Sequence, residues 1–161
     1  MNDRTFDPAL DLRIERIIHA PAERIWRAWT DPARLEKWWV PAPSTTRVDV
    51  LDVRPGGGFV TRMSDDGAEF VPHTDGIFLV VEQGERLVFT NAISSAWRPA
   101  APAPVAMTAE IALAPHAEGT AYRATVRHGN PADRDLHDEL GFHDGWGAVT
   151  AALAALVEDG D

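Results

Sequence analysis

The order of apolar and polar residues predicts a strand followed by two short helices at the start of the chain. Residues 12–18 alternate apolar and charged side chains, which is typical of a strand with one buried face. Residues 22–29 place their large apolar side chains on one helical face after a proline that suits a helix start. A second helix is expected over residues 30–39, with Thr30 or Asp31 as its cap.

The middle of the chain has the period-two pattern of strands, interrupted by glycine-rich turns. Three prolines within residues 94–104 predict a surface loop there, because proline lacks the N–H that a strand needs. The expected strands lie within residues 48–53, 59–63, 69–82, 86–91, 105–113 and 122–126.

A long helix is predicted at the end of the chain. One stripe of that helix, at spacings of four and three, consists of Phe142, Trp146, Val149, Leu153 and Leu156. The stripe begins among Gly141, Gly145 and Gly147, each of which costs a helix about 1 kcal/mol relative to alanine. We interpret these glycines as sites of close approach to a sheet or a ligand, and the helix as the lid of a cavity.

This order of elements predicts an α+β domain. A curved antiparallel sheet of about six to seven strands would wrap around the long C-terminal helix, with the two short helices closing one end. We expect a flexible leader over residues 1–11 and a single domain over residues 12–158.

Composition excludes several classes of function. The formal net charge of −10 disfavours nucleic acid and anionic lipid surfaces as partners. The chain has no cysteine, so disulfides, thiolate metal sites and cysteine nucleophiles are excluded. It has no apolar run near the ~20 residues of a membrane span and no signal-peptide pattern at its N-terminus. We therefore expect a cytoplasmic protein without a cofactor or a metal.

Several motifs together resemble one known family. They are the segment from Ala20 to Pro32, Leu35-Glu36-Lys37-Trp38-Trp39, Glu85-Arg86-Leu87-Val88-Phe89-Thr90, Gly119-Thr120, and Gly141-Phe142 with Gly145-Trp146. Over residues 12–157 the chain resembles the SRPBCC (START/birch-pollen-allergen-like) superfamily. More narrowly, it is similar to bacterial proteins related to the C-terminal domain of the activator of the ninety-kilodalton heat-shock chaperone's ATPase.

This resemblance implies a helix-grip fold with an apolar tunnel between the sheet and the C-terminal helix. Members of the superfamily bind lipids, sterols, polyketides or flavonoid-like molecules, and a few are cyclases or hydrolases. The chaperone activator has a further N-terminal domain that these residues do not match. A chaperone partner is therefore a secondary expectation.

The side chains expected to line the tunnel follow from strand and helix parity. Val80 and Leu87 are expected on the same inward faces, and each apolar side chain could equally be ordinary core. The predicted ligand-binding residues are Trp38, Trp39, Phe78, Phe89, Asn91, Trp97, Met107, Ala109, Tyr122, His128, Phe142 and Trp146.

Histidines are the candidates for chemistry in this cavity. His128 is expected on the inward face, as a hydrogen-bonding group or a general base. His73 is a secondary candidate for a base because Asp75 lies close to it in the sequence. His137 and His143 are six residues apart and do not share a helical face, so no metal site is expected from them.

The sequence favours a binding protein for a small apolar or aromatic molecule, such as a lipid, a polyketide or a flavonoid-like compound. One alternative is a cyclase or hydrolase that uses the same cavity with His128 as base. Another is a protein-interaction module, stress-related or chaperone-linked, that uses the surface around Trp97. A homodimer is a further alternative for the assembly.

Overall fold

The structure is a computed structural model that describes residues 5–160. The elements in order are β1 (Asp11–Ile18), α1 (Ala22–Thr30), α2 (Pro32–Leu35), β2 (Thr45–Leu51), β3 (Gly58–Ser64), β4 (Val71–Glu82), β5 (Arg86–Thr90), β6 (Thr108–His116), β7 (Gly119–Arg127), α3 (Pro131–Glu139) and α4 (Phe142–Glu158). The predicted leader at residues 1–11 falls partly outside the described residues. Within them, the backbone N–H of Asp11 donates to the Asp7 carbonyl in a turn that leads into β1.

The strands form one antiparallel sheet in the order β1-β7-β6-β5-β4-β3-β2. Consecutive strands from β2 to β7 are neighbours, and β1 joins the far edge beside β7. The chain therefore passes from one edge of the sheet to the other through α1 and α2. This arrangement confirms the predicted α+β class and the helix-grip architecture.

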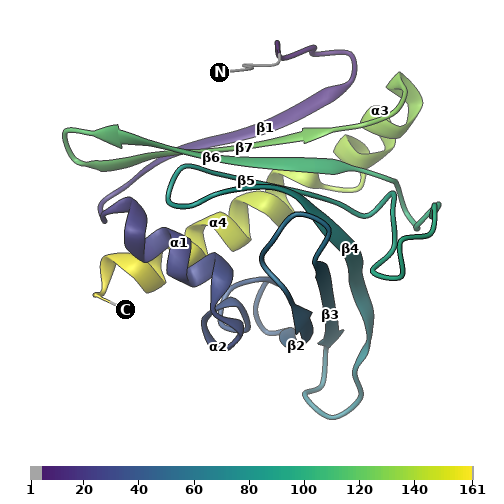
Figure 1. Cartoon of the computed structure of the whole chain (residues 1–161), viewed down its shortest axis with the longest axis horizontal. Coiled ribbons are helices and arrows are strands. Elements are labelled where there is room, and N and C mark those ends of the chain that lie inside the picture. Colours follow the sequence, from purple (N-terminus) through teal and green to yellow (C-terminus); the bar gives the residue numbers. More distant parts are fainter. Residues whose placement is uncertain (1–4, 161) are drawn as a thin grey trace.

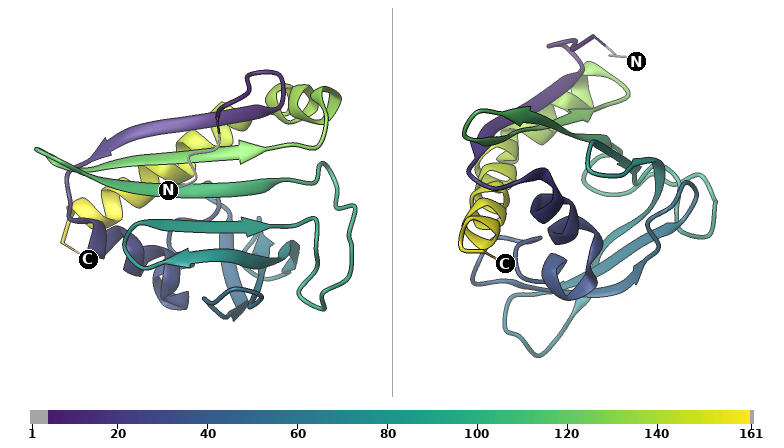
Figure 2. Two further views of the ribbon diagram at one scale, coloured as in Figure 1. Left: turned by 45° about the horizontal axis from the view of Figure 1, so that its top comes forward. Right: turned by 60° about the vertical axis from the view of Figure 1, so that its left-hand side comes forward.

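The helices cover one face of the curved sheet. Figure 1 shows α4 lying along the concave side, with α1 and α2 beside it. The two views in Figure 2 place α4 against the β1 side and the short helices beneath the middle of the sheet. The core between these layers is aromatic, and its largest fully buried rings are Trp29, Trp38, Phe59, Phe78, Phe89 and Phe142.

Local sequence signals set the helix starts. The Asp31 carboxylate accepts a hydrogen bond from the Ala33 N–H and caps α2, with Pro32 as the first helical residue. The Asn130 side chain caps α3 in the same way, at 2.8 Å from the Asp133 nitrogen. Both caps satisfy N–H groups that would otherwise lack partners at a helix start.

The terminal helix is divided in two, which differs from the single long helix of the prediction. Gly141 lies between α3 and α4 with a φ of 98°, in the left-handed region that favours glycine. The two helices are bent by 64° at this break. Within residues 5–160 no single helix is both long and apolar enough to cross a membrane; only the bent pair α3 and α4 together reaches that length and composition.

The sheet alternative of the prediction for the helix glycines, which expected close approach to a sheet or a ligand, is wrong. A Cβ atom placed on Gly145 or Gly147 would meet no atom within 4 Å outside its own helix. The close approach occurs instead at Gly76 in β4, where a Cβ would lie 2.0 Å from the Thr90 carbonyl oxygen. The glycines of α4 therefore leave open space beside the helix.

A bulge in β4 overturns the predicted orientation of Val80. Phe78 pairs with Phe89, but Val80 pairs with Val88, so one residue is inserted at Leu79. Because neighbouring residues of a strand point to opposite faces, Val80 faces away from α4 while Phe78 faces the core. Leu79 itself is 40% exposed.

Candidate functional site

A cavity of about 410 Å³ lies where the N-terminal end of α4 meets the open end of the sheet. Its walls come from the segment after α2, from β3, β4 and β5, from the loop before β6, and from α3 and α4. The lining residues are Trp39, Val40, Pro41, Met63, Pro72, His73, Thr74, Phe89, Asn91, Ala103, Pro104, Val105, Met107, His137, Gly145, Trp146 and Val149.

Aromatic rings form one wall of the cavity. The ring centroids of Trp39 and Trp146 are 6.4 Å apart at 76°, an edge-to-face arrangement. Phe89 lies 5.9 Å from Trp39, and Phe142 stacks behind Trp146 at 5.6 Å. This geometry presents π faces and edges to a ligand without needing further rearrangement of the rings.

The lining contains no Asp, Glu, Lys or Arg. Its polar side chains are those of His73, Thr74, Asn91 and His137. The cavity is thus mostly apolar with a few polar groups, which is the usual composition of a small-molecule site.

Two of these four polar groups already serve the fold. The Asn91 amide holds the loop before β6, because its Oδ1 accepts from the Met107 N–H at 2.8 Å and its Nδ2 donates to the Val105 carbonyl at 3.3 Å. The Thr74 hydroxyl oxygen accepts from the Trp39 indole N–H at 3.2 Å. These contacts position the aromatic wall and the loop rather than leaving the groups open for a ligand.

The other two polar groups are histidines with one nitrogen committed. His73 Nδ1 lies 3.3 Å from the Thr61 hydroxyl and 3.4 Å from that of Thr74. Desolvation by the surrounding protein lowers the pKa of His73 below its ordinary value. The ring is therefore neutral at neutral pH and keeps Nε2 for other contacts.

His137 is the end of a hydrogen-bonded chain that starts at the N-terminal turn. His128 Nδ1 is 2.8 Å from the Leu10 carbonyl, and His128 Nε2 is 2.8 Å from His137 Nδ1. Burial, reinforced by the neighbouring His128, lowers the pKa of His137 to about 4, although Asp138 opposes the shift. His137, like His73, is therefore a neutral imidazole in the lining of the cavity.

These hydrogen bonds correct the prediction that His128 lines the cavity. His128 is buried as expected, but it does not line the cavity, and both its ring nitrogens have partners. A general base needs a free nitrogen within reach of its substrate. The histidine of this pair that lines the cavity is His137, which lies on α3 nine residues further along the chain.

The structure divides the other predicted ligand-binding residues between the cavity and the core. The cavity brings together Trp39, Phe89, Asn91, Met107 and Trp146. Five others are buried and do not line it, which corrects their predicted position: Trp38, Phe78, Ala109, Tyr122 and Phe142.

Two of these core positions are explained by internal hydrogen bonds. The Trp38 indole donates to the Ala28 carbonyl at 3.0 Å, and the Tyr122 hydroxyl accepts from the Trp29 indole at 3.2 Å. Burial raises the pKa of Tyr122 far above its ordinary value. These polar groups are satisfied inside the core, so they have no need of a ligand.

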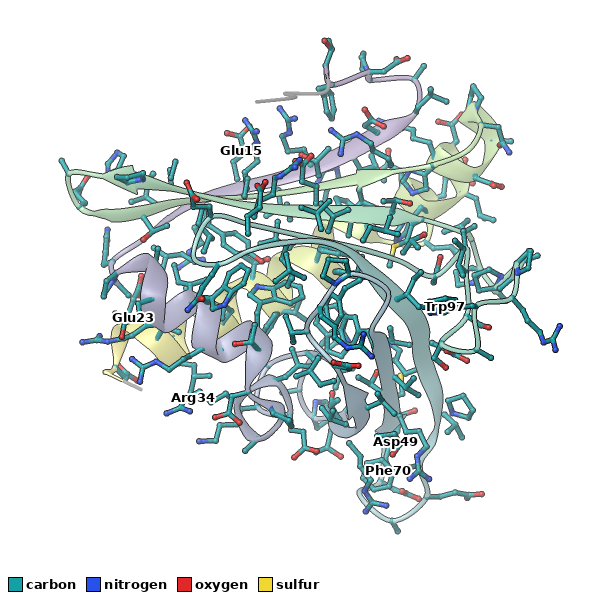
Figure 3. All side chains as sticks on the ribbon, in the orientation of Figure 1. Glu15, Glu23, Arg34, Asp49, Phe70 and Trp97 are labelled. Atoms are coloured by element: carbon teal, nitrogen blue, oxygen red, sulfur yellow. The ribbon has the colours of Figure 1, made fainter. Side chains whose placement is uncertain are left out.

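Trp97 lies outside the cavity, contrary to its predicted place over the ligand. It is 69% exposed on the loop between β5 and β6, at the periphery of the molecule (Figure 3). Its indole donates to the Gly56 carbonyl at 2.8 Å, and its φ of 63° lies in the left-handed region. The side chain is thus held against the turn before β3.

The cavity residues that the sequence reasoning missed come mainly from irregular segments. The alternation predicts a strand from residue 105, but β6 begins only at Thr108, so the loop with Ala103 and Pro104 reaches the cavity. The sequence pattern points to His137 only as a possible metal ligand. Periodicity carries no signal for either position, because each depends on how a loop or a bent helix packs.

A second hollow, of about 550 Å³, lies on the opposite face of the sheet. An ion-pair cluster forms part of it, since Glu110 binds Arg86 at 3.0 Å and Arg127 at 2.8 Å. Burial raises the pKa of Glu110, but the contacts with Arg127 and Arg86 outweigh it and lower the pKa below its ordinary value. Within residues 5–160 no group of three or more His, Cys, Asp or Glu side chains is placed to hold a metal ion.

Known proteins share this fold over nearly the whole chain. The family described as activator of Hsp90 ATPase homolog 1-like protein matches residues 19–158. A crystal structure of a Nitrosomonas europaea protein is 41% identical, with a TM-score of 0.86 over 96% of this chain and 97% of its own. No curated protein matches the chain.

More distant structures agree in fold. A Chromobacterium violaceum protein is 29% identical, with a TM-score of 0.72 over 92% of this chain and 98% of its own. An AHSA1-like protein from Aeromonas hydrophila is 22% identical, with a TM-score of 0.65 over 93% of each chain.

Proposed function

Since the chain belongs to the family of activator of Hsp90 ATPase homolog 1-like proteins, we propose that it binds a small apolar, aromatic molecule in the cavity beside α4. The observation that carries this proposal is the uncharged hollow of about 410 Å³ with Trp39 and Trp146 in its wall. The family supports a ligand-binding or chaperone-activator-like fold and leaves the ligand open.

Affinity would come from removing ligand surface from water. Buried apolar area contributes ~25 cal/mol per Å², of which only the surplus over the cost of association appears as affinity. Aromatic contacts with Trp39, Phe89 and Trp146 would add about 0.5–1.5 kcal/mol for each well-placed pair of rings. The flexible side chains of Met63 and Met107 can adjust to different ligand shapes.

Two glycines of α4 provide a matched test. Gly145 lines the cavity and Gly147 does not, yet a Cβ at either position meets no neighbouring atom. Gly145→Leu should fill the cavity and weaken binding of aromatic probes at least ~10-fold, because it removes the volume that a ligand would occupy. Gly147→Leu should gain the same helix propensity and bind like the parent.

Tryptophan fluorescence titration and thermal shift with naphthalene derivatives would measure both variants. Saturable binding that Gly145→Leu removes and Gly147→Leu preserves is the expected result. Absence of any saturable binding to the parent chain would overturn the proposal, and so would equal binding by both variants.

A second candidate function is a chaperone interaction, favoured by the exposed indole of Trp97. If the family's described activity applies here, the chain should stimulate the ATPase of purified Hsp90, and Trp97→Ala should reduce that stimulation. Gly145→Leu should leave it unchanged, since residue 145 lines the cavity and not the loop. No stimulation by the parent chain would remove this candidate.

A further inference from the structure

The two-histidine chain fixes which ring nitrogen of His137 carries a hydrogen. A carbonyl oxygen only accepts, so His128 Nδ1 must donate to Leu10. A neutral His128 then has no hydrogen on Nε2 and accepts the hydrogen bond from His137 Nδ1. In the neutral pair, His137 therefore carries its hydrogen on Nδ1, and its Nε2 is an acceptor.

His137 is one of the side chains that line the cavity. Within residues 5–160 its ring makes one hydrogen bond, between Nδ1 and His128 Nε2, so Nε2 is the ring nitrogen left for a ligand. The rest of its ring packs edge-on against Phe142, with centroids 5.1 Å apart. Two contacts thus set the position of the His137 ring, the hydrogen bond to His128 and the edge-to-face packing with Phe142.

The lining also restricts the charge of the ligand. No Asp, Glu, Lys or Arg side chain lines the cavity, and its basic side chains are the imidazoles of His73 and His137. An ionised group enclosed here would lose its hydration without gaining a counter-ion, which is strongly unfavourable. The cavity therefore selects against carboxylates and ammonium groups.

We propose that the ligand is a neutral hydroxylated aromatic compound, a phenol, whose O–H donates a hydrogen bond to His137 Nε2 while its ring lies against Trp39 and Trp146. This inference rests on the proposed function and specifies its ligand class. It separates phenols from fatty acids, whose carboxylate would be unpaired, and from plain hydrocarbons, which would leave the acceptor unmatched.

A series of naphthalenes at pH 8 tests the ligand class, because imidazoles with ordinary pKa values near 6.5 are neutral there. The probes are 2-naphthol, 2-methoxynaphthalene, which has no donor, and the charged 2-naphthoate and 2-naphthylmethylammonium. 2-Naphthol should bind about 3- to 10-fold more tightly than 2-methoxynaphthalene, the range of one net hydrogen bond. Both charged probes should bind at least ~10-fold more weakly than 2-naphthol.

Two histidine variants test whether the preference for 2-naphthol depends on His137. His137→Phe keeps a planar ring but removes the Nε2 acceptor of this residue, so the preference for 2-naphthol over 2-methoxynaphthalene should decrease sharply although His73 still lines the cavity. His143→Phe is the control, because the His143 side chain is 57% exposed and does not line the cavity. It should retain the naphthol preference of the parent.

The outcomes separate this inference from the proposed function. If none of the naphthalenes binds, the proposed function itself fails. If they bind but 2-naphthol has no advantage, or 2-naphthoate binds most tightly, the cavity binds ligands and the phenol assignment is wrong. The ligand comparison in the parent chain decides this even if His137→Phe does not fold.

Discussion

Two adjacent tryptophans mark the boundary between a filled half and a hollow half of the interior. Trp38 is 2% exposed, and its indole is bonded to the Ala28 carbonyl within the helical layer. Trp39 is 7% exposed and turns its ring to the cavity wall, with its indole on Thr74. Neighbouring residues of the same type therefore have different roles, which depend on what packs against them.

The filled half has rings packed on rings. Phe59 stacks on Phe78 at 5.2 Å and meets Phe89 edge-on at 5.0 Å. The hollow half also contains rings, those of Trp39, Phe89 and Trp146, but Gly145 and the flexible Met63 lie beside them in its wall. The two halves therefore differ in the size of the residues that accompany their rings.

The largest expected effect is the loss of a core ring. Phe59→Ala should lower the free energy of unfolding by about 3–5 kcal/mol, because Phe59 is fully buried and its removal leaves a void. Met63→Ala at the cavity wall should cost less than about half of that. Urea unfolding of both variants measures the difference, and equal losses would mean that the two halves are packed alike.

Removing the side chains that accept hydrogen bonds from the indole N–H groups should lower the free energy of unfolding by a smaller amount. Tyr122→Phe leaves the buried Trp29 N–H without an acceptor and should cost about 1–3 kcal/mol. Thr74→Val removes the acceptor of the Trp39 N–H beside the cavity, where water can replace it, and should cost under about 1 kcal/mol. Chemical denaturation tests the pair, and a larger loss for Thr74→Val would contradict the contrast.

The three helix glycines should respond differently to alanine. Gly145→Ala and Gly147→Ala should each stabilise the chain by up to about 1 kcal/mol, since both sites have space and lie inside α4. Gly141→Ala should instead destabilise it by about 1–2 kcal/mol, because its φ of 98° is strained for alanine. Thermal unfolding of the three variants checks the signs.

The last prediction concerns the pH dependence of stability that His137 causes between about pH 4 and 6.5. The pKa of His137 is about 4 in the folded chain against an ordinary 6.5, so the unfolded chain binds the proton more readily between these values. Its contribution to stability is complete above pH 6.5 and is lost as the pH falls toward 4. His137→Phe should flatten the pH dependence of unfolding over this interval relative to His143→Phe; parallel curves would count against it.

Part of this architecture could be predicted because the signal was local. The strand alternation and the Asp31 cap depend on residues near one another in the chain, and the structure confirms them. The alternation of residues along the strands also predicts that Ala109 and Tyr122 lie on the inner face of the sheet. Alternation does not distinguish a cavity from the core on that face, and both side chains lie in the core.

The sequence by itself determined the α+β order of elements, the alternation within the strands and the absence of thiol chemistry, because these follow from periodicity and composition. Only the tertiary structure decided where the cavity lies. The inserted Leu79 reverses the face of Val80, Gly141 lies at the 64° bend between α3 and α4, and His137 of α3 rather than His128 lines the cavity. A one-residue register shift or one left-handed residue redirects every side chain beyond it, and whether it occurs depends on packing between segments distant in the chain.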